Sequence, residues 1–202
     1  MRTPSCLKGD FLDLFSIDPK STALVLIDLQ NGIMGYPLAP YSGQQVVGKS
    51  LFLADAMRKA GSTIVFVRVN SAEVHHLPAD ISFRDPNAPP PPPSASELVP
   101  EIKLQGGDLV VTKRQWGAFY GTELDQQLRR RGVRTIVLGG IATNVGVEST
   151  ARAAHDHGYA LIFAEDAMTT LNPELHQFAV QRIFPIMGRV RSSAVIAESI
   201  AQ

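Results

Sequence analysis

Residues 134–166, RTIVLGGIATNVGVESTARAAHDHGYALIFAED, contain the pattern that decides the fold. The segment 134–140 is apolar and ends in two glycines, and 159–166 is a second apolar run. The loop between them leads into a helix that we predict from about Asn144 to His157. A strand, a helix and a second strand in this order are the unit from which parallel sheets are built. The stretch therefore predicts an α/β fold.

The same alternation continues on both sides of this unit. Apolar runs predict strands at 22–28, 63–69, 108–113, 134–140 and 159–166, and a short last strand at 188–193. Ser42 is the expected cap of a helix from about Gln44 to Ala60, a second helix runs from about Thr122 to Arg131, and Asn172 caps another. Strands that alternate with helices imply a doubly wound, mostly parallel sheet between two helical layers, which is a three-layer α/β sandwich.

The segment from about residue 70 to 107 does not follow this alternation. It contains RDPNAPPPPPSASELVP, in which five consecutive prolines favour polyproline II and exclude a helix or a central strand. A loop of this length in a compact domain is usually functional or disordered. Two interpretations stay open: a surface excursion, or a wall, a lid or an arm that reaches a neighbouring subunit.

The composition limits the class of protein. The chain has 202 residues without a strong compositional break, which predicts a single domain over 1–202. Lys plus Arg and Asp plus Glu both number 19, so no overall field attracts nucleic acid or an anionic membrane, and we expect neither partner. The balanced charge also removes repulsion as a barrier to an oligomer.

Cysteine usage and the apolar runs indicate the compartment. Cys6 is the only cysteine, which excludes a disulfide framework and a thiolate metal cluster. The N-terminal residues MRTPSCLKGDFLDLF carry charges within their apolar stretch, unlike the core of a signal peptide, and no apolar run is long enough to span a membrane. We therefore expect a cytoplasmic protein.

Three predicted strands end in residues that can take part in binding or catalysis. Asp28 ends the first strand, Lys113 ends the third, and the loop Gly140–Gly146 follows the fourth. Ligands of doubly wound sheets bind beyond the carboxyl ends of the strands, so an acid, a base and backbone donors are expected to meet there. Each also has a purely structural interpretation: a turn cap for Asp28, a surface cation for Lys113 and backbone geometry for the glycines.

Three segments carry a further signal: LVLIDLQNG, VTKRQWGAFYGTELDQQLRRRG and VLGGIATNVGVESTARAAHDHGYALIFAEDA. They resemble the signature segments of a known superfamily, the isochorismatase-like hydrolases, which also include nicotinamidases and N-carbamoylsarcosine amidase-like enzymes. The resemblance runs from about residue 22 to 193, with the segments in the right order and spacing. It implies a six-stranded parallel sheet and a homo-oligomer, either a dimer or a tetramer.

The resemblance also implies roles for individual residues. In the cysteine hydrolases of the superfamily the catalytic triad is Asp, Lys and Cys. Asp28 and Lys113 match the first two, and Gly146 occupies the place of the cysteine. A cis peptide bond between Ile141 and Ala142 is implied as well, with the N–H groups of Ala142 and Gly146 forming an oxyanion hole.

The glycine changes the expected mechanism. Hydrolysis through a thioester needs a thiolate at position 146, and Cys6, which has no base beside it in the sequence, is expected to be a packing residue. Isochorismatase proper also has glycine there, and it cleaves a vinyl ether by protonating the enol-pyruvyl methylene carbon and adding water. Burial would raise the pKa of Asp28 and suit it to deliver that proton, whereas Lys113 would oppose the shift and could bind an anion.

The remaining expectations concern the pocket and metals. Trp116, Phe119 and Asn144 are the expected pocket residues, although Phe119 also fits core packing. The segment after the second strand lacks the Asp-Trp-His pattern of the nicotinamidase metal site, and the adjacent His75 and His76 would point apart, so we expect no metal and no cofactor.

The sequence thus predicts a hydrolase without a cysteine nucleophile that acts on a small, anionic metabolite, with vinyl-ether hydrolysis of the isochorismate type as one candidate reaction. The alternative is a catalytically silent protein of the same fold that binds a small molecule or serves as a scaffold.

Overall fold

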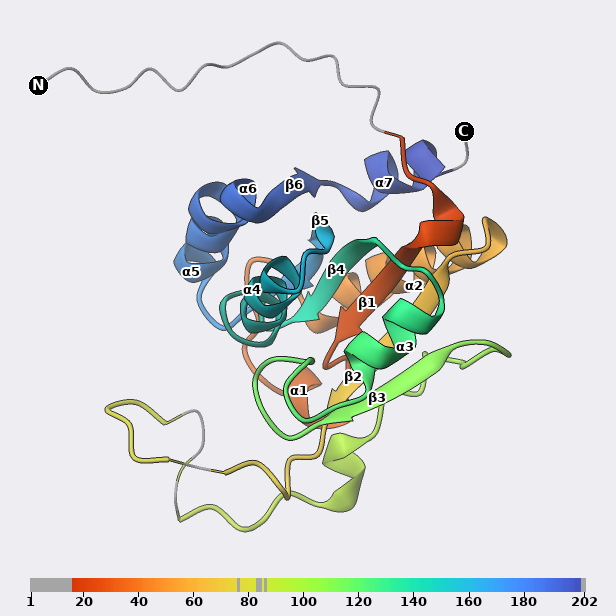
Figure 1. The fold of residues 1–202 in the computed structure, drawn as a ribbon. Coiled ribbons are helices and arrows are strands. Elements are labelled where there is room, and N and C mark those ends of the chain that lie inside the picture. The colour runs from red at the N-terminus through yellow and green to blue at the C-terminus, as the bar shows by residue number, and fades with distance from the viewer. Residues whose placement is uncertain (1–15, 76, 83–84, 86, 201–202) are drawn as a thin grey trace, which may run out of the picture.

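The computed structural model describes residues 16–75, 77–82, 85 and 87–200 (Figure 1). The sequence predicts a packing role for Cys6 and no metal-binding role for His76. Both residues lie outside the described residues.

Six parallel strands form one sheet in the order β3-β2-β1-β4-β5-β6, which confirms the predicted α/β fold. The strands are β1 Thr22–Ile27, β2 Thr63–Val69, β3 Leu109–Lys113, β4 Thr135–Ile141, β5 Ala160–Thr169 and β6 Gly188–Arg191. The chain builds outward from β1 to one side and then from β4 to the other. The carboxyl ends of β1 and β4 are therefore the point where a ligand crevice is expected in a doubly wound sheet.

The central strand β1 is apolar at every position because both of its faces are covered. All six residues of β1 are buried, as expected for an inner strand of a parallel sheet. Its neighbours pair with it in register on both sides, with Val25 opposite Val65 on β2 and Leu138 on β4.

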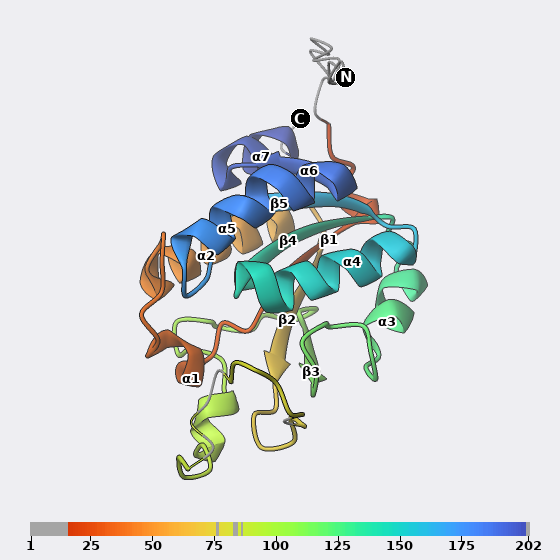
Figure 2. The same cartoon turned by 90° about the vertical axis from the view of Figure 1, so that its left-hand side faces the viewer.

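Helices cover both faces of the sheet (Figure 2). They are α1 Asn31–Met34, α2 Gly43–Lys59, α3 Leu124–Arg130, α4 Glu148–Asp156, α5 Pro173–Phe178, α6 Phe184–Met187 and α7 Ser193–Ile200. Apolar residues of α2 and α7 belong to one core, and those of α3, α4 and α6 belong to the other. None of the helices in the described part of the chain has both the length and the apolar character that a membrane span needs.

The predicted helix caps are present. Ser42 and Gln45 form a capping box at the start of α2, in which each side chain bonds the other residue's backbone N–H. Asn172 accepts a hydrogen bond from the N–H of Glu174, and Pro173 occupies the first position of α5.

Two predicted elements beside the carboxyl end of β4 differ from the sequence prediction. The helix expected from Asn144 begins instead with a π-helical turn, Thr143–Val147, before α4 starts at Glu148. The strand β5 continues to Thr169 because its last residues pair with Gly140 and Ile141 after a shift in register. Both differences lie at the carboxyl edge of the sheet.

The Pro-rich loop extends from the body of the protein between β2 and β3 (Figure 1). Its backbone at Pro92 has φ −65° and ψ 154°, the polyproline II conformation that the sequence predicts. The returning segment is held by the protein, since Leu98 pairs with Gln30 and the Val99 N–H donates to the Leu29 carbonyl. Val99 and Ile102 are buried in the core beside α2.

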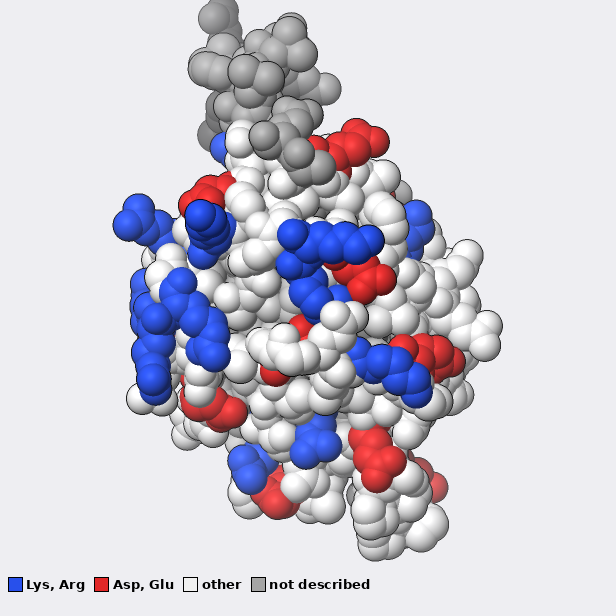
Figure 3. Space-filling model, turned by 90° about the vertical axis from the view of Figure 1, so that its right-hand side faces the viewer, with Lys and Arg blue, Asp and Glu red and all other residues white. Residues whose placement is uncertain are grey.

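Charged side chains of both signs are interspersed over the face in Figure 3, with broad uncharged areas between them. This arrangement agrees with the equal numbers of acidic and basic residues in the sequence.

Candidate active site

Asp28 lies at the end of β1 in an uncommon backbone conformation. Its φ of 52° is in the left-handed region that side chains other than glycine rarely adopt. Its N–H still donates to the Val67 carbonyl at 2.9 Å, so the residue remains attached to β2 while its side chain leaves the direction of the strand. Only 6% of Asp28 is exposed.

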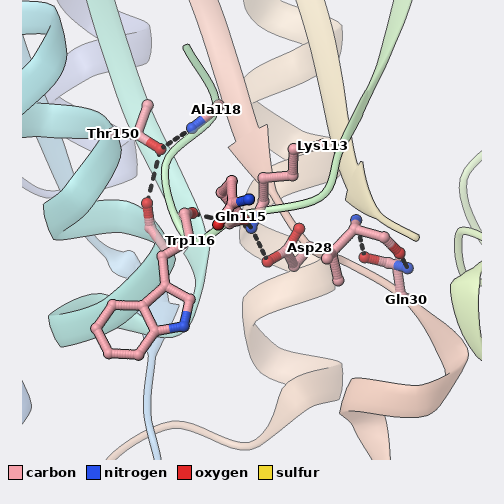
Figure 4. Close-up of polar contacts among 9 residues, drawn as sticks. Asp28, Gln30, Lys113, Gln115, Trp116, Ala118 and Thr150 are labelled. Carbon is pink, nitrogen blue, oxygen red and sulfur yellow. Dashed lines mark hydrogen bonds and ion pairs between the residues drawn. The ribbon is translucent and has the colours of Figure 1, made fainter. Parts of the chain in front are cut away.

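Lys113, from the end of β3, pairs with Asp28 across the intervening strand β2. Its Nζ atom lies 2.8 Å from Asp28 Oδ2 and also donates to the carbonyls of Gln115 at 3.1 Å and Trp116 at 2.9 Å (Figure 4). These three acceptors match the three N–H groups of an ammonium. Lys113 is therefore a fixed, buried cation and not the surface cation that the sequence left open.

Burial raises the pKa of Asp28 to about 6, and the charge and hydrogen bond of Lys113 offset only part of this shift. Asp28 Oδ1 is buried and has no hydrogen-bond partner among the described residues. Desolvation, which raises the pKa of Asp28, is thus a larger effect than the interaction with Lys113, which lowers it. The carboxyl group can therefore hold a proton near neutral pH.

Gly146 directly faces this pair. A Cβ atom built on Gly146 would lie 3.4 Å from Asp28 Oδ2, 3.5 Å from the Trp116 carbonyl oxygen and 3.0 Å from Ile27 Cγ2. A side chain at this position would thus point at the carboxylate. The peptide bond between Ile141 and Ala142 is cis, as the family resemblance implied.

Gly140 explains why the turn begins with glycine. It has a φ of 111°, and a Cβ atom there would lie 2.1 Å from the Ile27 carbonyl oxygen. The backbone of β4 can approach the end of β1 only because no side chain is present.

Thr150 connects the segment after β3 to the π-helical turn. Its hydroxyl accepts a hydrogen bond from the Ala118 N–H at 3.1 Å and donates to the Gly146 carbonyl at 2.7 Å (Figure 4). Ala118 and Gly146 are therefore held in one arrangement by a single buried side chain.

The other side of the π-helical turn is held by residues that the sequence did not reveal. Thr143 Oγ1 lies 2.9 Å from Nδ1 of His176 on α5, and Asn144 Oδ1 accepts from Thr170 Oγ1 at 2.6 Å. His176 is buried, and burial lowers its pKa. Nothing in the local pattern around His176 could have indicated this contact, because its partner is 33 residues away.

Gln30 is a second residue that the sequence reasoning missed. Its side-chain amide accepts from the Val69 N–H at 2.7 Å and donates to the Val69 carbonyl at 2.9 Å (Figure 4). The side chain thereby continues the β1–β2 pairing beyond Asp28. A polar residue three positions after the buried strand β1 was the available signal.

A pocket of about 210 Å³ opens above these groups. Its polar lining consists of Asp28, Lys113, Gln115, Asn144 and Thr170. Backbone and small side chains of Ala142 and Gly146 adjoin them, and the walls are apolar or aromatic: Ile33, Tyr36, Leu38, Val69, Val74, Trp116, Ile141, Val145, Leu171 and Leu175.

The expected pocket residues separate into two groups. Trp116 and Asn144 line the pocket, and Trp116, the only tryptophan, is 57% exposed. Phe119 is not among the lining residues, and its ring packs against His157 and Tyr159 at centroid distances of 5.1 and 5.9 Å. The structure thus places Phe119 in the core, the alternative that its sequence also allowed.

The fold and the site define a doubly wound α/β protein with a buried acid–base pair at its strand ends. The isochorismatase domain profile matches residues 22–195. The chain is 47% identical over 195 residues to the uncharacterized isochorismatase family protein YwoC of Bacillus subtilis, covering 94% of this chain and 99% of that protein. It is 39% identical to the uncharacterized isochorismatase family protein YecD of Escherichia coli O157:H7, covering 93% and 100%.

A solved structure supports the same assignment. An isochorismatase family protein from Burkholderia thailandensis has a TM-score of 0.85 and 42% identity, covering 93% of this chain and 98% of that one. The chain therefore belongs to the isochorismatase family.

Two relatives with assigned activities are hydrolases. Ureidoacrylate amidohydrolase RutB of Stutzerimonas stutzeri is 31% identical, covering 89% of this chain and 83% of that protein. Nicotinamidase 3 of Arabidopsis thaliana is 30% identical, covering 82% and 83%. The predicted class, a hydrolase of this family, is confirmed.

Proposed function

We propose that the protein hydrolyses a small anionic molecule by acid–base catalysis at Asp28, without a covalent thioester. The observation that carries this proposal is the buried Asp28–Lys113 pair, 2.8 Å apart at the base of the pocket and beside Gly146. The sequence resemblance assigns Gly146 to the position of the family's cysteine. The acid and its partner are retained, and the position that would attack has no side chain.

Vinyl-ether hydrolysis fits this set of groups. Protonated Asp28 transfers its proton to the terminal methylene carbon, which gives an oxocarbenium ion, and a water molecule adds to that cation. The water returns a proton to the Asp28 carboxylate, and the hemiketal collapses to a ketone and an alcohol. The N–H groups of Ala142 and Gly146 are assigned to bind the substrate oxygen at the pocket base.

Lys113 acts on the substrate through its charge. Its N–H groups are already used by Asp28 and two carbonyls, so it attracts an anion without exchanging those bonds. When Asp28 is protonated, the pair carries a net positive charge. An anionic substrate and the acid form of Asp28 therefore stabilise each other. The apolar walls favour a compact substrate whose charge lies at one end.

Pyruvate release from isochorismate by the purified protein tests the proposal. We expect turnover by the wild type and a loss of about 100-fold or more in Asp28→Asn, because the general acid is removed. Asp55→Asn, an exposed aspartate on α2, is the matched control and should retain activity.

Circular dichroism of Asp28→Asn checks that the variant is folded, since the substitution leaves Lys113 buried without its anion. Full turnover by folded Asp28→Asn would refute the assigned role. No release by the wild type would exclude isochorismate. A metabolite that copurifies and is recovered unchanged would favour the silent binding protein.

A further inference from the structure

The structure contains a second cavity, of about 310 Å³, between the ends of β2 and β3 and the Pro-rich loop. We propose that this cavity binds a small organic carboxylate, with Arg68 as the residue that holds its charged end. This inference is independent of the hydrolysis proposed at Asp28.

The second cavity is separate from the pocket at Asp28. Val69 and Lys113, which pair in the register of β2 and β3, line the first pocket. Their preceding neighbours, Arg68 and Thr112, also pair with each other and line the second cavity. Because successive strand residues point to opposite faces, the two cavities lie on opposite sides of this edge of the sheet.

The guanidinium of Arg68 is held in one orientation, but no acidic side chain among the described residues forms a salt bridge with it. Its Nε–H donates to Thr112 Oγ1 at 3.0 Å, which fixes the plane of the guanidinium. No other acceptor among the described residues bonds the Arg68 side chain, although the residue is half-buried. Arg58, by contrast, donates through Nε and Nη2 to both carboxylate oxygens of Asp108. In Arg68 the N–H groups on Nη1 and Nη2 remain, and these two nitrogens can bind a carboxylate at two points from the end of the guanidinium.

The rest of the lining selects the kind of anion. Pro91–Pro93 form an apolar wall, which can pack against a carbon skeleton but offers no N–H donor. The Ser96 hydroxyl accepts from the Ser71 N–H at 3.0 Å, so its own proton is available to a ligand oxygen. Glu97, the other charged lining residue, is exposed, and its negative charge disfavours multiply charged anions. The combination fits a monocarboxylate better than phosphate.

Amide-resolved NMR titration of the full-length protein with sodium benzoate tests the proposal. We expect saturable shifts of the backbone amides of Asn70, Ala72 and Ser96 and of the Arg68 Nε–H signal. Arg68→Met should weaken benzoate binding by about tenfold or more, and Arg68→Lys, which keeps the charge but loses the planar fork, should weaken it less. Arg130→Met, which removes an exposed arginine of α3, should bind as the wild type does.

Three results of this titration would overturn the proposal. The first is the absence of saturable shifts, and the second is a set of shifts confined to residues around the first pocket, such as Gly146. The third is unchanged benzoate binding by folded Arg68→Met. Tighter binding of inorganic phosphate than of benzoate would overturn the carboxylate assignment. Wild-type benzoate binding by Asp28→Asn is expected, so the two proposals fail or succeed separately.

Discussion

Asp28 combines two effects that oppose each other within one side chain. Burial favours its neutral form, and Lys113 at 2.8 Å favours its charged form, with a resulting pKa of about 6. A carboxyl group with this pKa can serve as an acid at physiological pH, which an exposed aspartate cannot.

The pH dependence of turnover follows from this value. If the protonated form of Asp28 is the active one, kcat/KM should be constant below a pH of about 6 and fall about tenfold per pH unit above it. A pH–rate profile measures this directly. A profile that rises with pH through the same range would instead assign Asp28 the role of a base.

A substitution of Gly146 is expected to lower turnover strongly while it changes the unfolding free energy little. Gly146→Ala places a methyl group 3.4 Å from Asp28 Oδ2, where a reacting water or substrate atom is expected, so turnover should fall about tenfold or more. The unfolding free energy should change by no more than about 1 kcal/mol, because the helical preference of alanine offsets the tight contact with Ile27.

The matched control is Gly48→Ala, on α2, where an added Cβ atom meets no neighbour. It should stabilise the protein by about 1 kcal/mol and leave turnover unchanged, as measured by urea unfolding and the same assay. Equal activity in the two variants would show that the space beside Asp28 is not used.

At the scale of elements, the site depends on how α4 and the segment after β3 are joined. Thr150 is the direct link, since its hydroxyl bonds both the Ala118 N–H and the Gly146 carbonyl. The residue acts through its neighbours and is a positioning residue.

Thr150→Val keeps the shape of the side chain but leaves the buried Ala118 N–H without its partner. We expect a loss of about 1–3 kcal/mol in unfolding free energy. We also expect kcat to fall by a larger factor than the factor by which KM changes. Thr150→Ser retains the hydroxyl and should recover most of the wild-type kcat. If Thr150→Ser were as impaired as Thr150→Val, the lost methyl group would be the cause and the positioning role would be wrong.

The elements that sequence could predict are those whose signals are local. The apolar run of β1 and the Ser42 cap of α2 are contained in a few consecutive residues, and both elements begin within a residue or two of the prediction. The sequence could also predict that Asp28 and Lys113 meet, because parallel strands bring their carboxyl ends to one edge of the sheet.

The missed features depend on contacts between distant residues. The π-helical turn is held by His176 and Thr170, and the last residues of β5 pair with the end of β4. The helix α7, which packs against α2, carries no local signal beyond its apolar composition. Phe119 could have faced either the pocket or the core, and only the packing of its neighbours decides.

At the scale of the whole molecule, the expectation of a single domain is open to a direct test. Trp116, the only tryptophan, lies at the pocket on a loop after β3, whereas far-UV circular dichroism averages over all helices and strands. If the chain is one cooperative unit, urea unfolding curves from tryptophan fluorescence and from circular dichroism should coincide. Two separated transitions would contradict a single domain. Light scattering on the same sample would give the subunit number, which stays a prediction.

The position of Lys113 has a consequence for biosynthesis. The ammonium reaches Asp28 across β2, and the π-helical turn that contains Gly146 follows β4, which is made later still. A nascent chain that has left the ribosome only as far as the third strand holds the acid and its cation but not the backbone that completes the pocket. We therefore expect truncated translation products to be inactive, because the residues proposed for catalysis come together only when the centre of the sheet has closed.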